Sequence, residues 1–289
     1  MEIKPKPNFF IAGMPRSGTT SLYTYLKQHP DIYLALYKEP HFFGTDLTRG
    51  NPYNIEDEEV YYSLFEHAGN KTCIGEGSVW YLTSKTAAAE INAFNPEAKI
   101  IAMLRKPLEM IYSLHSLYVR TGNDDVTDFQ QAVEIQAERM KGKSLPTTCY
   151  YPEGLLYTEV AKYYEKLKRF IDAFGKERVH VIVFDDFSKD TPRCYRETLE
   201  FLELDSSFPA EFDLEKADRL IRPQVLQQIR GSHPEVKRKL ANKTGLKAHK
   251  SPKRNPLPPE FISALNNLFR DDIEKTGQLI GRDLRHWVN

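Results

Sequence analysis

The segment from Gly13 to Thr20 reads Gly-Met-Pro-Arg-Ser-Gly-Thr-Thr and brings a guanidinium, three hydroxyl groups and two glycines together within eight residues. A short apolar run precedes it and a helical spacing of apolar residues follows it, so it connects a strand to a helix N-terminus. Glycines let backbone N–H groups turn inward around an anion, and the helix dipole adds positive charge. The predicted anion-binding residues are Arg16, Ser17, Gly18, Thr19 and Thr20.

The glycine spacing of this loop matches the Walker A pattern G-x-x-x-x-G-K-[ST], but Thr19 stands where that pattern has its lysine. A loop without that lysine is poorly equipped for γ-phosphoryl transfer, whereas Arg16 suits the 5′ end of a shorter nucleotide. A nucleotide kinase or NTPase stays open as an alternative, because Val181–Asp186 has the pattern of a Walker B strand. A non-catalytic nucleotide-binding module is a third interpretation.

Residues 15–21, P-R-S-G-T-T-S, resemble the 5′-phosphosulfate-binding loop of sulfotransferases that use PAPS, 3′-phosphoadenosine-5′-phosphosulfate. A second segment, from Leu104 to Ser113, resembles the 3′-phosphate motif L-R-[DN]-P-x-x-R-x-x-S of that family, with Met110 in place of its second arginine. Arg105 follows a strand pattern, at the strand end where α/β sheets bind ligands. Arg105 and Ser113 are therefore expected to bind the 3′-phosphate together.

Lys38-Glu39-Pro40-His41-Phe42-Phe43 resembles the K-E-x-H-F-F segment of the heparan sulfate and related bacterial sulfotransferases, in which the glutamate is the proposed general base. An acceptor O–H must lose its proton as it attacks sulfur. Neighbouring aromatic side chains would partly desolvate the Glu39 carboxylate and raise its pKa towards a useful range. The resemblance makes Glu39 the first candidate for the base and His41 the second, with Lys38 orienting the donor or acceptor.

The stretch from Gly75 to Tyr81 resembles the family segment E-K-T-P-x-Y, with Gly77 in place of a lysine that binds the sulfuryl end in the heparan enzymes. Trp80 and Tyr81 are candidate walls of an acceptor pocket and equally candidates for the core. His115, on the helix after Arg105, is a further acceptor-site candidate and a weaker candidate for the base.

A basic segment runs from Lys237 to Arg254 with eight Lys and Arg residues and no acid. PAPS carries roughly four negative charges, since a phosphate monoester adds nearly two, and related sulfotransferases close a basic loop over the nucleotide. The resemblance assigns Lys250, Lys253 and Arg254 to the donor. The segment lacks the aromatic residues that a nucleic-acid-binding tail would use for stacking, and residues 233–259 are expected to be mostly loop.

The composition of the 289-residue chain is ordinary for a globular protein, and its 40 basic and 40 acidic residues balance. This balance argues against a protein that coats nucleic acid or an anionic membrane. The three cysteines form no CxxC pair, and no metal site is expected. The N-terminus lacks the apolar run of a signal peptide and no segment has the length of a membrane span, so we expect a cytoplasmic protein.

Strand and helix patterns alternate along the chain, which predicts an α/β fold with a P-loop-like parallel sheet flanked by helices on both faces. We expect a single domain over residues 1–289, with a PAPS-binding core at about 8–120 and 176–205 and a cofactor-covering segment at about 237–258. Predicted strands are 9–12, 32–34, 73–76, 99–105 and 179–184. Predicted helices are 19–29, 60–65, 85–94, 107–118, 127–141, 155–174, 191–202 and 259–276.

Taken together, these features predict transfer of a sulfuryl group from PAPS to a hydroxyl or amine, with release of PAP by in-line displacement at sulfur. Arg16 and the loop N–H groups would stabilise charge on the leaving oxygen, a preorganised electrostatic role. Fixed cations take the place of Mg²⁺, so no metal is expected. The acceptor is expected to be a small metabolite or a sugar, and the cytoplasmic expectation and the zero net charge favour a small molecule slightly over a polysaccharide.

Overall fold

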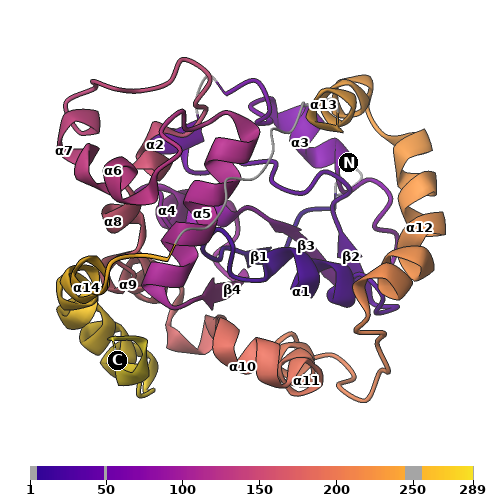
Figure 1. Ribbon diagram of the computed structural model, residues 1–289. Coiled ribbons are helices and arrows are strands. Elements are labelled where there is room, and N and C mark those ends of the chain that lie inside the picture. Colours follow the sequence, from indigo (N-terminus) through magenta and orange to yellow (C-terminus); the bar gives the residue numbers. More distant parts are fainter. Residues whose placement is uncertain (1–4, 49–50, 245–255, 289) are drawn as a thin grey trace. The chain divides into compact units, whose positions relative to one another are not determined.

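The computed structural model describes residues 5–48, 51–244 and 256–288 (Figure 1). Its five strands pair in parallel in the order β2-β3-β1-β4-β5, which confirms the predicted parallel sheet. All five predicted strands are present within one or two residues of the expected bounds. The strands are β1 (Phe9–Ile11), β2 (Ile32–Leu34), β3 (Cys73–Gly77), β4 (Lys99–Leu104) and β5 (Val179–Val183).

The chain divides into two compact units. The first unit comprises Met1–Leu104 and Arg169–Gly245 and contains the whole sheet; the second comprises Arg105–Lys168 and Leu246–Asn289. The single domain over residues 1–289 stays a prediction. Helices of the first unit are α1 (Thr19–Leu26), α2 (Thr45–Thr48), α3 (Glu58–Ser63), η1 (Val79–Tyr81), α4 (Ala87–Phe94), η3 (Lys176–Arg178), α10 (Phe184–Lys189), α11 (Thr191–Phe201), α12 (Leu214–Gly231) and α13 (Pro234–Thr244).

The described part of the second unit is helical, and α9 (Tyr164–Phe174) leads from it into the first unit. Among the described residues, no helix has the length and apolar character that crossing a bilayer would need. The helices of the second unit are α5 (Pro107–Thr121), α6 (Phe129–Glu134), α7 (Gln136–Arg139), η2 (Pro152–Leu155), α8 (Tyr157–Val160), α14 (Pro259–Ile280) and η4 (Arg285–Val288).

Helices of the first unit cover both faces of the sheet. Successive residues of β1 point to opposite sides of the sheet, so the strand packs against different neighbours on each face. Phe9 and Ile11 join one apolar cluster with Leu22 of α1 and Tyr195 of α11. Phe10 faces the other way and packs edge-on against Phe43, with ring centroids 5.8 Å apart. A strand buried on both faces explains why β1 is apolar at every position rather than alternating.

Two predicted helices are each broken into a pair. The helix expected at 127–141 is divided between α6 and α7 at Ile135, and the one expected at 155–174 is divided between α8 and α9. The second break has a tertiary cause. Asp272 of α14 accepts hydrogen bonds from the backbone N–H groups of Tyr163 (2.6 Å) and Tyr164 (3.2 Å), so a distant carboxylate caps the start of α9.

The prediction that residues 233–259 are mostly loop was wrong for its first part, where α13 is helical. Lysine and arginine are good helix formers, and Val236 and Lys239 bury one side of this helix. The Lys239 ammonium donates to the carbonyls of Pro52 and Asn54, at 2.9 and 2.6 Å. Lys250, Lys253 and Arg254 lie outside the described residues. Helices α10 and α12 were not predicted.

Candidate active site

The loop from Gly13 to Thr20, which we call the donor loop, leaves β1 and enters α1 beside β4. The backbone N–H of Met14 donates to the carbonyl of Met103 at 2.8 Å, so the loop continues the pairing of β1 with β4. A β-carbon at position 13 would lie 2.9 Å from the backbone nitrogen of Met103, which leaves room for glycine only. Gly18 caps α1 with φ +90°, a left-handed conformation that glycine adopts without strain.

The donor loop has the features of an anion site. The Ser17 side chain is fully buried, and its hydroxyl oxygen has no hydrogen-bond partner among the described residues. The first turn of α1 contains no acidic residue, and its N-cap residue, Gly18, has no side chain that could cap the N–H groups. Buried polar atoms and helix N-termini ordinarily find partners. An anion bound between Ser17 and the start of α1 would satisfy both, with Arg16 and Thr20 exposed beside them and Thr19 buried.

Arg105 and Ser113 belong to the second unit. Arg105 directly follows β4, and its guanidinium pairs with Glu109 one turn into α5, with Nη2 3.0 Å from Oε2. Ser113 is buried on the same helix. Their joint role in binding a phosphate stays a prediction. In such a role, the phosphate would compete with Glu109 for the Arg105 guanidinium.

His115 is a core residue of the second unit. Its Nε2 lies 2.8 Å from the carbonyl oxygen of Val126, and its ring packs against Phe129 and Tyr157. Burial lowers the pKa of this imidazole. The side chain is 1% exposed, so in this structure it presents no surface to an acceptor.

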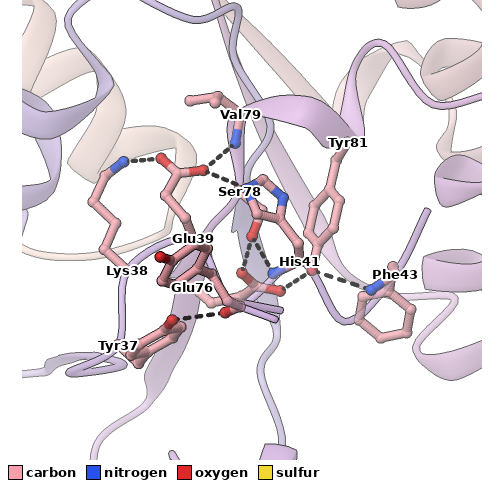
Figure 2. A network of polar contacts seen from close by, with 10 residues as sticks. Tyr37, Lys38, Glu39, His41, Phe43, Glu76, Ser78, Val79 and Tyr81 are labelled. Carbon is pink, nitrogen blue, oxygen red and sulfur yellow. Dashed lines mark hydrogen bonds and ion pairs between the residues drawn. The ribbon is translucent and has the colours of Figure 1, made fainter. Parts of the chain in front are cut away.

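The segment Lys38–Phe43, which we call the base segment, follows β2 and contacts the carboxyl end of β3 at Gly77. Figure 2 shows its Lys38, Glu39, His41 and Phe43 side chains. Glu39 and His41 both have a left-handed backbone, with φ of 64° and 48° on either side of Pro40. Such a conformation costs non-glycine residues on the order of 1–3 kcal/mol each, and it persists where the surroundings enforce it. The backbone N–H of Glu39 is fixed to the carbonyl of Gly77 at 2.9 Å.

The Glu39 carboxylate is bound on both oxygens (Figure 2). Oε2 accepts from the backbone N–H of Val79 at 2.8 Å and lies 3.2 Å from Nε2 of His41. Oε1 pairs with the Lys38 ammonium. The structure therefore brings together Lys38, Glu39 and His41, three of the residues predicted to act on the acceptor, and the side chains of Lys38 and Glu39 remain 20% and 18% exposed.

The prediction that Glu39 has a raised pKa was wrong. Burial does act to raise it, but the Lys38 ammonium and the hydrogen bond and charge of His41 act more strongly together, and the pKa of Glu39 lies well below its ordinary value. A neighbouring carboxyl does have a raised pKa: burial raises the pKa of Glu76 on β3 to about 7.

Glu76 was not singled out by the sequence reasoning. It is fully buried, and it accepts hydrogen bonds from the hydroxyls of Tyr61 (3.1 Å), Ser78 (2.8 Å) and Tyr81 (2.6 Å). A signal was present in the sequence. An acid between two glycines in an otherwise apolar strand needs polar partners, and Ser78 and Tyr81 follow at short spacing.

Trp80 and Tyr81 both lie in the core, 5% and 0% exposed, which is the second of the two interpretations of these residues. A β-carbon at Gly77 would lie 3.2 Å from the Tyr23 ring, so a side chain at this position would require the ring to shift by a few tenths of an ångström. The Lys38 ammonium lies over the same ring, 5.9 Å from its centroid. Lys38 is thus a cation close to the position where the family lysine is missing.

The Walker B alternative has little support in the sheet order. Asp185 and Asp186 begin α10 after β5, an edge strand that β4 separates from β1 and the donor loop. Phe184, in front of them, packs over Gly18. In the described ranges no group of three or more His, Cys, Asp or Glu side chains could hold a metal ion.

Comparison with known proteins identifies the family to which the chain belongs. The family model described as sulfotransferase domain matches residues 6–277. Carbohydrate sulfotransferase 15 of Mus musculus is 28% identical over 68% of this chain, a match that covers 44% of the relative, so the chain spans less than half of that protein. Membrane-associated sulfotransferase kil1 of Dictyostelium discoideum is 22% identical over 98% of this chain and 67% of the relative.

Among solved structures, the sulfotransferase from Alicyclobacillus acidocaldarius superposes with a TM-score of 0.78 at 28% identity, covering 99% of this chain and 100% of that one. A mouse sulfotransferase crystallised with PAP shares the fold, with a TM-score of 0.51 at 16% identity, over 95% of this chain and 88% of that one. Because the family model covers nearly the whole sequence, including the donor loop and the base segment, the chain belongs to the sulfotransferase family.

Proposed function

We propose that the protein transfers a sulfuryl group from PAPS to a hydroxyl or amine of a sugar or small metabolite and releases PAP. The observation that carries this proposal is the donor loop, in which the buried Ser17 hydroxyl has no partner among the described residues and faces no competing acid at the start of α1. The match to sulfotransferases over residues 6–277 supports the same chemistry.

In the proposed complex, the donor loop binds the 5′-phosphosulfate of PAPS, while Arg105 and Ser113 bind its 3′-phosphate. The loop supplies N–H groups, hydroxyls and the Arg16 guanidinium, which suit a group that gains negative charge during the reaction. A second phosphate site on another segment would distinguish PAPS from a nucleotide with no 3′-phosphate. These assignments explain why cations appear at both segments in a chain of zero net charge.

The acceptor oxygen or nitrogen attacks sulfur as the bond from sulfur to the bridging oxygen of PAP breaks. The acceptor proton passes to Glu39, and the electron pair of the broken bond stays on the 5′-phosphate of PAP, where the donor loop and Arg16 stabilise it. Lys38 keeps Glu39 ionised before the reaction. When the Lys38 ammonium turns to the sulfuryl oxygens, Glu39 becomes a stronger base. His41, on the same carboxylate, is the second candidate for the base.

Two facts bear on the class of acceptor, and they favour different acceptors. The matched relatives include proteins named as carbohydrate sulfotransferases, which favours a sugar hydroxyl. The zero net charge offers little attraction for a long polyanionic glycan, which favours an uncharged sugar or a small metabolite. Incubation with PAPS and panels of sugars, phenols and amines, followed by mass spectrometry for products heavier by one SO₃, identifies the class.

The cytoplasmic location stays a prediction.

Binding of PAP is expected to raise the melting temperature Tm. At a ligand concentration about 100 times Kd the stabilisation is about 2.7 kcal/mol, which corresponds to several degrees of Tm in a chain of this size. Arg16→Ala and Arg105→Ala should each remove most of the shift. Arg193→Ala, which deletes a half-exposed arginine on α11, is the matched control and should keep it.

ATP with Mg²⁺ should shift Tm little in the same experiment. A large shift with ATP and Mg²⁺ and none with PAP would replace this proposal with a nucleotide kinase. PAP binding without turnover on any acceptor, together with indifference to Glu39→Gln, would indicate a non-catalytic nucleotide-binding module.

A further inference from the structure

A serine hydroxyl connects the buried carboxyl of Glu76 to the backbone of His41. Ser78 Oγ accepts the backbone N–H of His41 at 3.1 Å and donates its own hydrogen to Oε2 of Glu76 at 2.8 Å (Figure 2). The backbone of His41 is therefore linked through Ser78 to the fully buried side chain of Glu76.

A second hydroxyl makes the same connection two residues later. The backbone N–H of Phe43 donates to the Tyr81 hydroxyl at 3.3 Å, and that hydroxyl donates to Oε1 of Glu76 at 2.6 Å. Both oxygens of one carboxyl thus hold the base segment, each through an intervening hydroxyl. The Tyr61 hydroxyl also donates to Oε1, at 3.1 Å, but among the described residues it accepts no hydrogen bond from a backbone N–H of the base segment.

The direction of these hydrogen bonds requires a group with two acceptor oxygens. Each linking hydroxyl uses a lone pair for a backbone N–H, so its single hydrogen must go to another acceptor. An ionised carboxylate accepts on both oxygens and completes both chains together. A glutamine at position 76 would present an amide N–H to one of the two hydroxyls, and that chain would have to reverse or break.

The burial of Glu76 indicates a role other than stability. The side chain is 0% exposed, and burial raises its pKa to about 7 in spite of three hydroxyl donors. Replacing a buried charged group by a well-packed apolar side chain often leaves the stability of a protein unchanged or increases it. The presence of a buried acid is therefore weak evidence that it stabilises the fold. The base segment next to it needs support, because Glu39 and His41 are both held in the left-handed region.

We propose that Glu76 is a positioning residue that holds the base segment in its strained conformation through the hydroxyls of Ser78 and Tyr81, and so aims Glu39 and His41 at the acceptor. This inference rests on the proposed function, in which one of these two side chains takes the acceptor proton. It assigns no contact between Glu76 and either substrate.

The test compares kcat, the KM for PAPS and the PAP-induced Tm shift in the wild type and in four variants, E76Q, S78A, Y81F and Y61F. E76Q should lower kcat by about 10²-fold, the loss expected for a misplacement of about 1 Å at a catalytic group. S78A and Y81F each break one chain and should lower kcat by roughly 10-fold, since the other chain remains. The KM for PAPS and the PAP shift should stay near wild type.

Y61F is the matched control. It removes a hydrogen bond to the same Glu76 oxygen that Tyr81 uses and keeps the ring that stacks on Phe42, with centroids 4.0 Å apart. Its kcat should stay within about 2-fold of wild type, because the Tyr61 hydroxyl bonds to Glu76 without linking it to a backbone group of the base segment. Equal losses of kcat in Y61F and Y81F, or full activity in E76Q, would overturn the positioning role.

If E76Q fails to fold, S78A and Y81F decide the question, because each keeps the carboxyl and deletes a single hydroxyl. Near-wild-type kcat in both would overturn the inference. A wild-type protein that binds PAP but sulfates no acceptor would overturn the proposed function together with this inference. An active wild type with an active E76Q would overturn the inference alone.

Discussion

Replacement of Glu39 by glutamine is expected to lower kcat by about 10²–10⁴-fold, the contribution of a positioned general base. Glutamine keeps the shape of the side chain and can still accept from the Val79 N–H, which lies 2.8 Å from Oε2. It cannot take the acceptor proton or hold the Lys38 ammonium as an ion pair. The PAP-induced Tm shift should be retained, because the donor loop lies after a different strand.

The measurement is initial-rate kinetics with PAPS and the best acceptor found. Glu66→Gln, at an exposed position, is the control for loss of one negative charge and should leave kcat unchanged. His41→Asn separates the two candidates for the base: a larger loss than in Glu39→Gln would assign the proton to His41. Full activity of Glu39→Gln would exclude the carboxylate as the base.

The lowered pKa of Glu39 also predicts how the stability of the protein changes with pH. Its pKa is lower in the folded than in the unfolded protein, so the folded state binds fewer protons at this group as pH falls below the ordinary value of 4.5. The stability that its ion pair contributes is therefore present above pH 4.5 and is lost as pH falls towards the folded pKa. Urea denaturation should show the gap in unfolding free energy between wild type and Glu39→Gln narrowing in acid.

Arg139→Met is expected to destabilise the second unit by about 3–5 kcal/mol, the usual cost of removing one partner of a buried ion pair. Arg139 forms two hydrogen bonds with Asp124, at 3.0 and 2.6 Å, and both side chains are 0% exposed. Tyr157 donates to the same carboxylate at 2.7 Å. Without the guanidinium, a buried negative charge remains with only neutral partners.

Calorimetry and denaturant unfolding measure this loss. Arg285→Ala is the matched control, because Arg285 pairs with Asp283 at 2.6 Å but the two side chains are 82% and 58% exposed. An exposed pair contributes about 0–1 kcal/mol. A loss in Arg139→Met no greater than that in Arg285→Ala would show that the buried pair adds no stability over an apolar contact.

Much of the fold was predictable because its signals are local. Five short apolar runs, two of them ending at or near a glycine, are typical of strands buried on both faces, and all five form the parallel sheet. The donor loop was equally local, since its glycines, hydroxyls and Arg16 are consecutive in the sequence. The base segment was identified in the same way, from six adjacent residues.

Signals that depend on distant partners were missed. The break between α8 and α9 is made by Asp272, more than a hundred residues after Tyr163, and no pattern near the break indicates it. His115 looked like a candidate for chemistry because histidine often is one, but its partners Val126 and Tyr157 place it in the core. The helix α13 in the basic segment depends on Lys239 reaching the carbonyls of Pro52 and Asn54.

By itself, the sequence determined which residues make up the candidate site: a predicted anion loop after the first strand and a Lys-Glu-x-His segment after the second. The tertiary structure decided their electrostatics. A pKa depends on every charge and dipole within a few ångströms, and these come from separate segments. Lys38 and His41 therefore keep Glu39 ionised, while burial raises the pKa of Glu76, which Tyr61, Ser78 and Tyr81 enclose.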